Sequence, residues 1–156
     1  MILMRRPGSI LLLSCYELGR QPLGIAWPMA FLKQAGFEPA ALDLSIEGLD
    51  LAKVSQARLV GISVPMHTAL RMGVQAAKRV RATNPSCHIC FYGLYASLNA
   101  DYLLSEVADS VIGGEIEEAL VSLAQALEKG KPFEVEGVSF RGRPQSPLIR
   151  KISFIP

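Results

Sequence analysis

A glycine pair followed by an acidic residue, Gly113, Gly114 and Glu115, is the part of this sequence best suited to meet a ligand. It follows a run of β-branched residues that is typical of a strand buried inside a parallel sheet. The glycines remove side chains where that strand ends, which permits sharp backbone angles and close approach by a ligand. Because ligands of open α/β sheets bind beyond the carboxyl ends of the strands, we interpret these three residues as part of a binding crevice.

Four more candidate side chains fall in loops expected at the same edge: Tyr16, Glu17, His67 and Tyr95. His67 follows the third expected strand and can approach a ligand from above, although a solvated loop histidine is the alternative. Tyr16 and Glu17 belong to the first crossover loop and are expected to shape the rim. Tyr95 can flank the same space, or simply pack over a helix. No Ser-His-acid or Cys-His arrangement can be placed, so no catalytic residue is predicted.

The sequence Cys87-His88-Ile89-Cys90 resembles a redox or metal-binding motif. On a strand, however, side chains three positions apart point to opposite faces, with about 10 Å of rise between them. The two cysteines therefore cannot close a disulfide or share a metal without breaking the strand. We predict no protein ligand to a metal and interpret Cys90 as a small buried hydrophobic residue.

Strand-like and helix-like segments alternate along the chain with short connections. The expected strands are residues 9–14, 38–44, 59–64, 88–92 and 110–112, and the expected helices are residues 24–34, 49–57, 68–82, 98–107 and 116–129. This alternation predicts a flavodoxin-like (Rossmann-like) three-layer α/β sandwich with a five-stranded parallel sheet in the order 2-1-3-4-5. The crevice then opens where the first and third strands diverge. Residues 1–132 form this domain, and 133–156 are expected to hold an edge strand or hairpin and a linker towards a missing C-terminal domain.

The composition is that of a folded protein. The 156 residues fit one domain, with 50% hydrophobic and 19% charged residues, and a net charge of +2 gives no sign of a nucleic-acid partner. Three cysteines are too few for a disulfide framework and favour a reducing compartment. No apolar run approaches the roughly 20 residues of a membrane span, so a cytoplasmic protein without a membrane partner is expected.

Common ligands of this fold are disfavoured by the loop sequences. A dinucleotide site requires Gly-x-Gly-x-x-Gly after the first strand, and residues 15–24 have the wrong spacing. A phosphate-accepting receiver domain requires acidic residues after the first strand and an aspartate after the third. Those positions hold Ser14-Cys15 and Ser63-Val64.

Several short motifs, in their order and spacing, resemble the cobalamin-binding domain at the front of many radical S-adenosylmethionine enzymes. They are Gln-Pro-Leu-Gly-Ile-Ala at residues 21–26, the leucine and alanine-glycine helix ending at 31–38, Asp43-Leu44, Gly61-Ile62-Ser63, and the glycine pair with Glu115, Glu117 and Glu118. The resemblance implies that the corrin ring lies across the carboxyl ends of the strands and that its dimethylbenzimidazole tail enters the sheet beside small residues.

The resemblance assigns cofactor contacts to Ser63, to Gly93 with its neighbour Leu94, and to the glycine pair. Ordinary turn glycines and a strand-ending serine are the alternative. The family's Asp-x-His-x-x-Gly motif is missing from the first loop, so cobalt would have no histidine ligand from there. The iron–sulfur motif Cys-x-x-x-Cys-x-x-Cys is also absent, so the resemblance implies that the cluster and S-adenosylmethionine belong to a catalytic partner domain expected beyond Pro156.

The resemblance thus implies a corrinoid-binding module, with a role in methyl transfer beside a catalytic partner and no catalysis by this chain alone. A non-enzymatic interaction module of the same fold that has lost corrinoid is the alternative.

Overall fold

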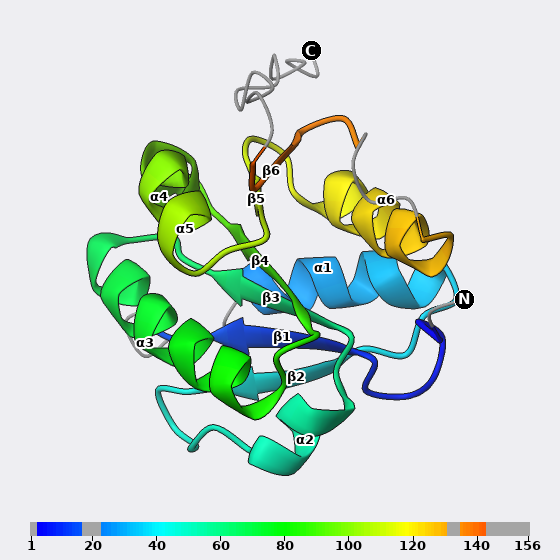
Figure 1. The fold of residues 1–156 in the computed structure, drawn as a ribbon. Coiled ribbons are helices and arrows are strands. Elements are labelled where there is room, and N and C mark those ends of the chain that lie inside the picture. The colour runs from blue at the N-terminus through cyan, green and yellow to red at the C-terminus, as the bar shows by residue number, and fades with distance from the viewer. Residues whose placement is uncertain (1–2, 17–22, 131–134, 143–156) are drawn as a thin grey trace.

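The computed structural model describes residues 3–16, 23–130 and 135–142, which form one sheet with helices on both faces (Figure 1). The strands are β1 (Ile10–Ser14), β2 (Ala40–Asp43), β3 (Leu59–Ser63), β4 (His88–Tyr92), β5 (Ser110–Ile112) and β6 (Val138–Phe140). The helices are α1 (Leu23–Gln34), α2 (Leu51–Gln56), α3 (His67–Thr83), α4 (Leu94–Leu98), α5 (Ala100–Glu106) and α6 (Glu117–Glu128).

The sheet has the order β2-β1-β3-β4-β5-β6, so the predicted flavodoxin-like order is confirmed for the first five strands, which pair in parallel. The sheet has one strand more than the five predicted parallel strands, because β6 pairs with β5 in the antiparallel direction. This strand lies where the sequence predicted an edge strand or hairpin arm. Val138 and Phe140 are buried, so β6 also extends the core past β5.

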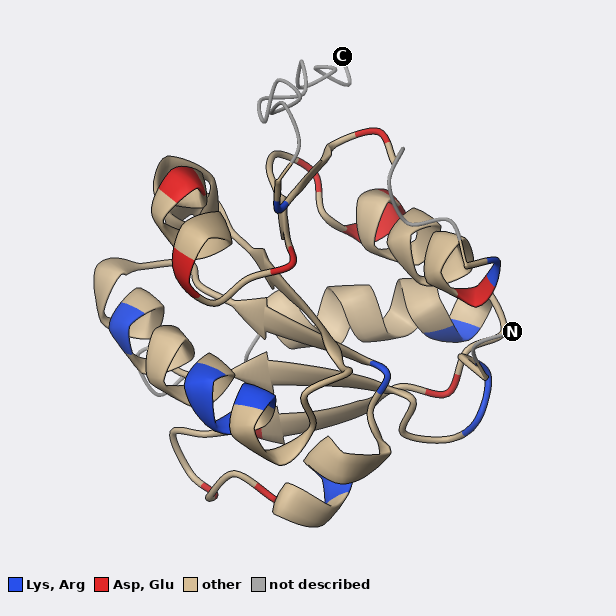
Figure 2. Ribbon diagram, viewed as in Figure 1, with Lys and Arg blue, Asp and Glu red and all other residues tan. Residues whose placement is uncertain are grey.

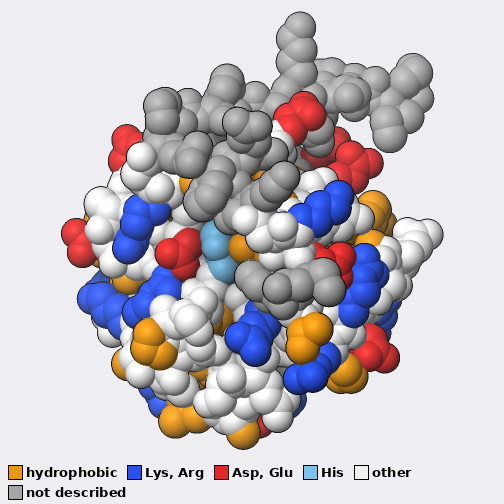
Figure 3. All heavy atoms as spheres, turned by 45° about the vertical axis from the view of Figure 1, so that its right-hand side comes forward, with side chains coloured by type: hydrophobic (Ala, Val, Ile, Leu, Met, Phe, Trp, Pro, Cys, Tyr) orange, Lys and Arg blue, Asp and Glu red, His pale blue; other side chains and the backbone are white. Residues whose placement is uncertain are grey.

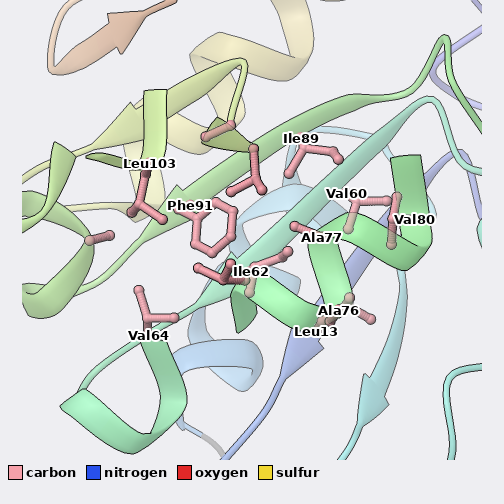
Figure 4. Close-up of a cluster of buried hydrophobic side chains, with 14 of the residues drawn as sticks. Leu13, Val60, Ile62, Val64, Ala76, Ala77, Val80, Ile89, Phe91 and Leu103 are labelled. Atoms are coloured by element: carbon pink, nitrogen blue, oxygen red, sulfur yellow. The ribbon is translucent and has the colours of Figure 1, made fainter. Parts of the chain in front are cut away.

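Two hydrophobic layers hold the sheet between the helices. One layer lies under α1 and α6 and includes Leu12, Tyr92 and Leu123. The other lies under α2 to α5 and contains Val60, Ile62, Phe91 and Leu103 together with the apolar residues of α3 (Figure 4). Strand residues alternate between the two layers, as period-2 side-chain geometry requires.

Helix α3 approaches the sheet closely through Gly73. A Cβ at this position would lie 3.1 Å from both Ile62 Cγ2 and Val64 Cγ1, so only glycine fits without displacing them. The opposite side of α3 carries exposed cationic residues, whereas acidic residues are found on α5 and α6 (Figure 2). None of the helices within the described ranges has the length and apolar character needed to cross a membrane.

The predicted helix at residues 98–107 is wrong in extent. The chain forms two helices there, with Asn99 between them in a non-helical conformation at φ −120° and ψ 26°. The Asn99 amide nitrogen Nδ2 donates to the Tyr95 carbonyl over 2.8 Å. Asparagine side chains compete with helical hydrogen bonds in this way, and the competition separates α4 from α5.

The cysteines lie as strand alternation predicted. Cys87 belongs to the layer under α3 and Cys90 to the layer under α1 and α6. Burial raises the pKa of each thiol to about 12, and the same holds for Cys15. These cysteines are buried packing residues rather than reactive thiols.

Candidate functional site at the carboxyl edge of the sheet

The predicted crevice position follows from the strand order. After β1 the chain crosses to β2 on one side of the sheet, and after β3 it crosses to β4 on the other. At this switch point the connections that follow β1 and β3 lead away from each other. Ligands of open α/β folds bind between the carboxyl ends of two such strands. Pairing in register sets Ser14, Ser63, Tyr92 and Ile112 next to one another along this edge.

Tyr92 fills the space beside Ser63. Its side chain is fully buried in the layer under α1 and α6, and its hydroxyl donates a hydrogen bond to the Gly24 carbonyl of α1 over 2.7 Å. A Cβ at Gly61 would lie 3.2 Å from Tyr92 Cε1 and 2.8 Å from Leu12 Cδ2. The room that Gly61 leaves is therefore taken up by the tyrosine ring and a leucine, and not by an open slot.

Sequence reasoning missed Tyr92, although two signals were present. The residue ends its strand directly before Gly93, and strand alternation gives it the same face as Cys90. What the sequence lacked was the pairing of Tyr92 with Ser63, which comes from the sheet register.

Gly93 has a packing explanation that needs no ligand. Its backbone is at φ 108° and ψ 171°, a region that is essentially restricted to glycine. A Cβ there would lie 2.8 Å from the Val64 carbonyl oxygen and 3.3 Å from the Pro65 nitrogen. That carbonyl also accepts a hydrogen bond from the Tyr95 N–H over 3.2 Å. Gly93 thus lets the loop after β3 lie against the start of α4.

His67 and Tyr95 lie together at the rim. His67 is the exposed first residue of α3, and its ring meets the Tyr95 ring edge-on, with centroids 6.2 Å apart. Tyr16 and Tyr95 are half-buried and pack against the layer under α3, whereas Leu94 is 63% exposed. Glu17 lies outside the described residues. The aromatic residues therefore gather on the α3 side of the sheet, on the face opposite Tyr92.

The glycine pair lies beyond β5, one strand further along the edge. Gly113 is buried and its N–H donates to the Gly137 carbonyl over 3.4 Å, while Gly114 is exposed with φ 74°. Glu115 is exposed beside it. Glu117 and Glu118 occupy the first turn of α6, where carboxylates interact favourably with the helix dipole.

These residues fit a corrinoid in part. Leu94, His67 and Glu115 are exposed at or beside the carboxyl edge, where a flat ring can lie. The tail that the family resemblance places beside Ser63 does not fit, because the Tyr92 side chain occupies that space. Within residues 3–16, 23–130 and 135–142, no group of three or more His, Cys, Asp or Glu side chains is arranged to hold a metal ion.

A second polar cluster, not predicted from the sequence, lies at the amino ends of the strands. Arg81 pairs with Asp109 at 2.5 Å, and Asp109 also accepts from the Ile89 N–H at 2.9 Å. His88 Nε2 lies 2.8 Å from the Ser110 hydroxyl oxygen. Burial lowers the pKa of His88 to about 4, against the opposing attraction of Asp109.

Arg81, His88 and Asp109 line a hollow of about 430 Å³ together with Arg58. On the face turned forward in Figure 3, an imidazole is visible in a recess among acidic and basic side chains. His88 is hydrogen-bonded to Ser110, and Asp109 is bonded to Arg81 and to the Ile89 N–H, so the cluster ties β4 and β5 to the end of α3.

Comparison with known proteins identifies the fold. No known family model matches the chain, and no curated protein matches it. Among solved structures, it is similar to the radical S-adenosylmethionine methyltransferase TsrM from Kitasatospora setae, described with a tryptophan substrate and a S-adenosylmethionine analogue, at 18% identity and a TM-score of 0.69. This match covers 83% of the chain but 28% of TsrM.

The chain is also similar to a CheY-like response regulator receiver domain from Methanospirillum hungatei JF-1. That match has 18% identity and a TM-score of 0.55, and it covers 78% of this chain and 94% of the other. At such identities a likeness establishes the fold alone. The chain therefore has a flavodoxin-like α/β fold, which it shares with part of a radical S-adenosylmethionine methyltransferase and with a receiver domain.

Proposed function

We propose that this chain is a corrinoid-binding module that acts beside a radical S-adenosylmethionine catalytic domain in the same polypeptide. The observation that carries the proposal is the switch-point edge between β1 and β3, in a fold that overlays 83% of the chain on part of TsrM. When bound, a corrinoid supplies a cobalt centre that can carry a methyl group. The chain's own residues would bind the ring, orient it and limit its contact with water.

The receiver-domain likeness does not favour phosphoryl chemistry. In the structure, β1 ends at Ser14 and β3 ends at Ser63, so a serine occupies the place where a receiver requires its phosphoacceptor aspartate. These serines supply neither the carboxylates that usually hold Mg²⁺ nor the aspartate that accepts the phosphoryl group.

Binding can be tested with two corrinoids, hydroxocobalamin and dicyanocobinamide, which lacks the nucleotide tail. After incubation and gel filtration, at least one should elute with the protein and show a shifted visible spectrum. If neither elutes with the protein, the proposal is wrong.

A matched pair of surface variants locates the site. Leu94 and Leu98 belong to the same short helix and are 63% and 68% exposed, so a charge at either position should be tolerated by the fold. Leu94 begins the helix at the carboxyl edge, whereas Leu98 ends it one turn further away. Leu94→Glu should weaken corrinoid binding by about tenfold, and Leu98→Glu should leave it nearly unchanged. Equal effects would argue against a site at this edge.

A second candidate function is an interaction module without corrinoid. The filled space at Tyr92 favours it, and so do the exposed apolar side chains of Leu94, Leu98 and Tyr102, which are 63%, 68% and 51% exposed on α4 and α5. The catalytic domain in the same polypeptide is then the occupant of this apolar surface. The corrinoid experiment above separates the two candidates.

A further inference from the structure

The side chain of Tyr92 is fully buried in the hydrophobic layer between the sheet and α1. We infer that its side chain fills the space where the family resemblance places a nucleotide tail, so that the domain binds corrinoids lacking the tail in preference to cobalamin. The inference rests on the proposed function, and it assigns a specificity-determining role to a residue that the sequence placed only at the end of a strand.

The ring of Tyr92 is held from several sides. The residue has no exposed surface, and its hydroxyl reaches the Gly24 carbonyl in the first turn of α1 at 2.7 Å. Displacing the ring would lose this hydrogen bond and expose a large apolar surface to water. Each loss corresponds to about tenfold in an equilibrium constant, so a ligand that requires the displacement binds correspondingly more weakly.

Two small residues, Gly61 and Ser63, lie next to Tyr92 and leave room for its large ring. Gly61 faces the ring, because a Cβ there would lie 3.2 Å from Tyr92 Cε1. Ser63 is the register partner of Tyr92 on the neighbouring strand. If the ring is removed, neither Gly61 nor Ser63 has the atoms to fill the space. Truncation at position 92 should therefore open a cavity between the sheet and α1, and an apolar cavity of this kind can accept an aromatic ring.

The residues that we expect to contact the corrin ring lie apart from the Tyr92 side chain. Leu94, His67 and Tyr95 lie at or beside the rim on the α3 side, whereas Tyr92 points to the α1 side. A corrin ring can therefore rest on the edge while Tyr92 keeps its place. This separation predicts that changes at Tyr92 alter the preference between corrinoids more than they alter binding of the tail-free ring.

The test measures the Kd of dicyanocobinamide and of cyanocobalamin by visible absorbance, for the natural chain and for Tyr92→Ala and Tyr92→Phe. The natural chain should bind cobinamide at least about tenfold more tightly than cobalamin. Tyr92→Ala should reduce this preference at least about tenfold by gaining affinity for cobalamin. Tyr92→Phe retains the ring and should keep the preference, so it controls for loss of the hydroxyl.

The outcomes separate the inference from the function. If the natural chain binds both corrinoids equally, or if Tyr92→Ala leaves the preference unchanged, the inference is wrong while corrinoid binding stands. If no variant binds either corrinoid, the proposed function itself fails. Circular dichroism establishes whether Tyr92→Ala folds; if it does not, the preference of the natural chain decides the question.

Discussion

Replacing Gly93 by alanine should destabilise the fold far more than replacing another glycine with positive φ. The backbone of Gly93, at φ 108° and ψ 171°, lies in a region that costs a residue with a side chain about 1–3 kcal/mol. The new Cβ would lie 2.8 Å from the Val64 oxygen, 3.0 Å from its carbonyl carbon and 3.3 Å from the Pro65 nitrogen. All three are backbone atoms, so no side-chain rotation relieves the clash.

Relief requires the loop after β3 to move away from β4. That movement strains two backbone hydrogen bonds, from Val64 N–H to the Tyr92 carbonyl at 2.8 Å and from Tyr95 N–H to the Val64 carbonyl at 3.2 Å. At about 1 kcal/mol for each bond, the total cost of Gly93→Ala is about 3–5 kcal/mol. This is a large part of the 5–15 kcal/mol that typically separates a folded domain from its unfolded state.

Gly130→Ala is the matched control. Gly130 also has a positive φ, 74°, but a Cβ there would have no neighbour within 4 Å. Its left-handed conformation costs about 1–2 kcal/mol, partly offset by about 0.4–1 kcal/mol from a less flexible unfolded chain. Urea unfolding followed by far-UV circular dichroism gives both free energies. If Gly93→Ala loses no more stability than Gly130→Ala, the packing explanation for Gly93 is refuted.

Three further predictions concern groups that are wholly or partly buried. The pKa of His88 is about 4 in the fold and 6.5 in an unfolded chain, so the unfolded state takes up the proton first as the pH falls. The free energy of unfolding should be highest above about pH 6.5 and decrease by up to roughly 3 kcal/mol towards pH 4. His88→Gln should flatten this dependence in urea titrations. The buried thiols of Cys15, Cys87 and Cys90 have pKa values of about 12, so they should not react with iodoacetamide at pH 8 until the protein is unfolded. Mass spectrometry measures the labelling, and rapid labelling of the native protein would contradict their burial. Asn84 donates to two carbonyls at the end of α2, at 2.9 and 2.7 Å, so Asn84→Ala should cost about 1–3 kcal/mol in thermal unfolding, and Asn84→Asp, which cannot donate, should cost at least as much.

The sequence alone determined most of the architecture. Buried strands and amphipathic helices have different apolar periods, so their alternation located every parallel strand. The order of the five parallel strands was predicted by analogy with the flavodoxin-like fold, and the structure confirms it. The same local geometry set Cys87 and Cys90 on opposite faces of the sheet. The positions of the strands and the faces of the two cysteines depend on residues that are close together in the chain.

The contents of the candidate site depended on contacts between distant segments. The sequence indicated that Ser63, Gly93 and the glycine pair are small, but small residues leave space only if no neighbour fills it. Register pairing sets Tyr92 beside Ser63, and its hydroxyl bonds to Gly24, 68 positions away. The approach of Val64 to Gly93 and the pairing of Arg81 in α3 with Asp109 likewise join segments that are far apart in the sequence. Periodicity tells which face a side chain takes, whereas only tertiary packing decides what lies across from it.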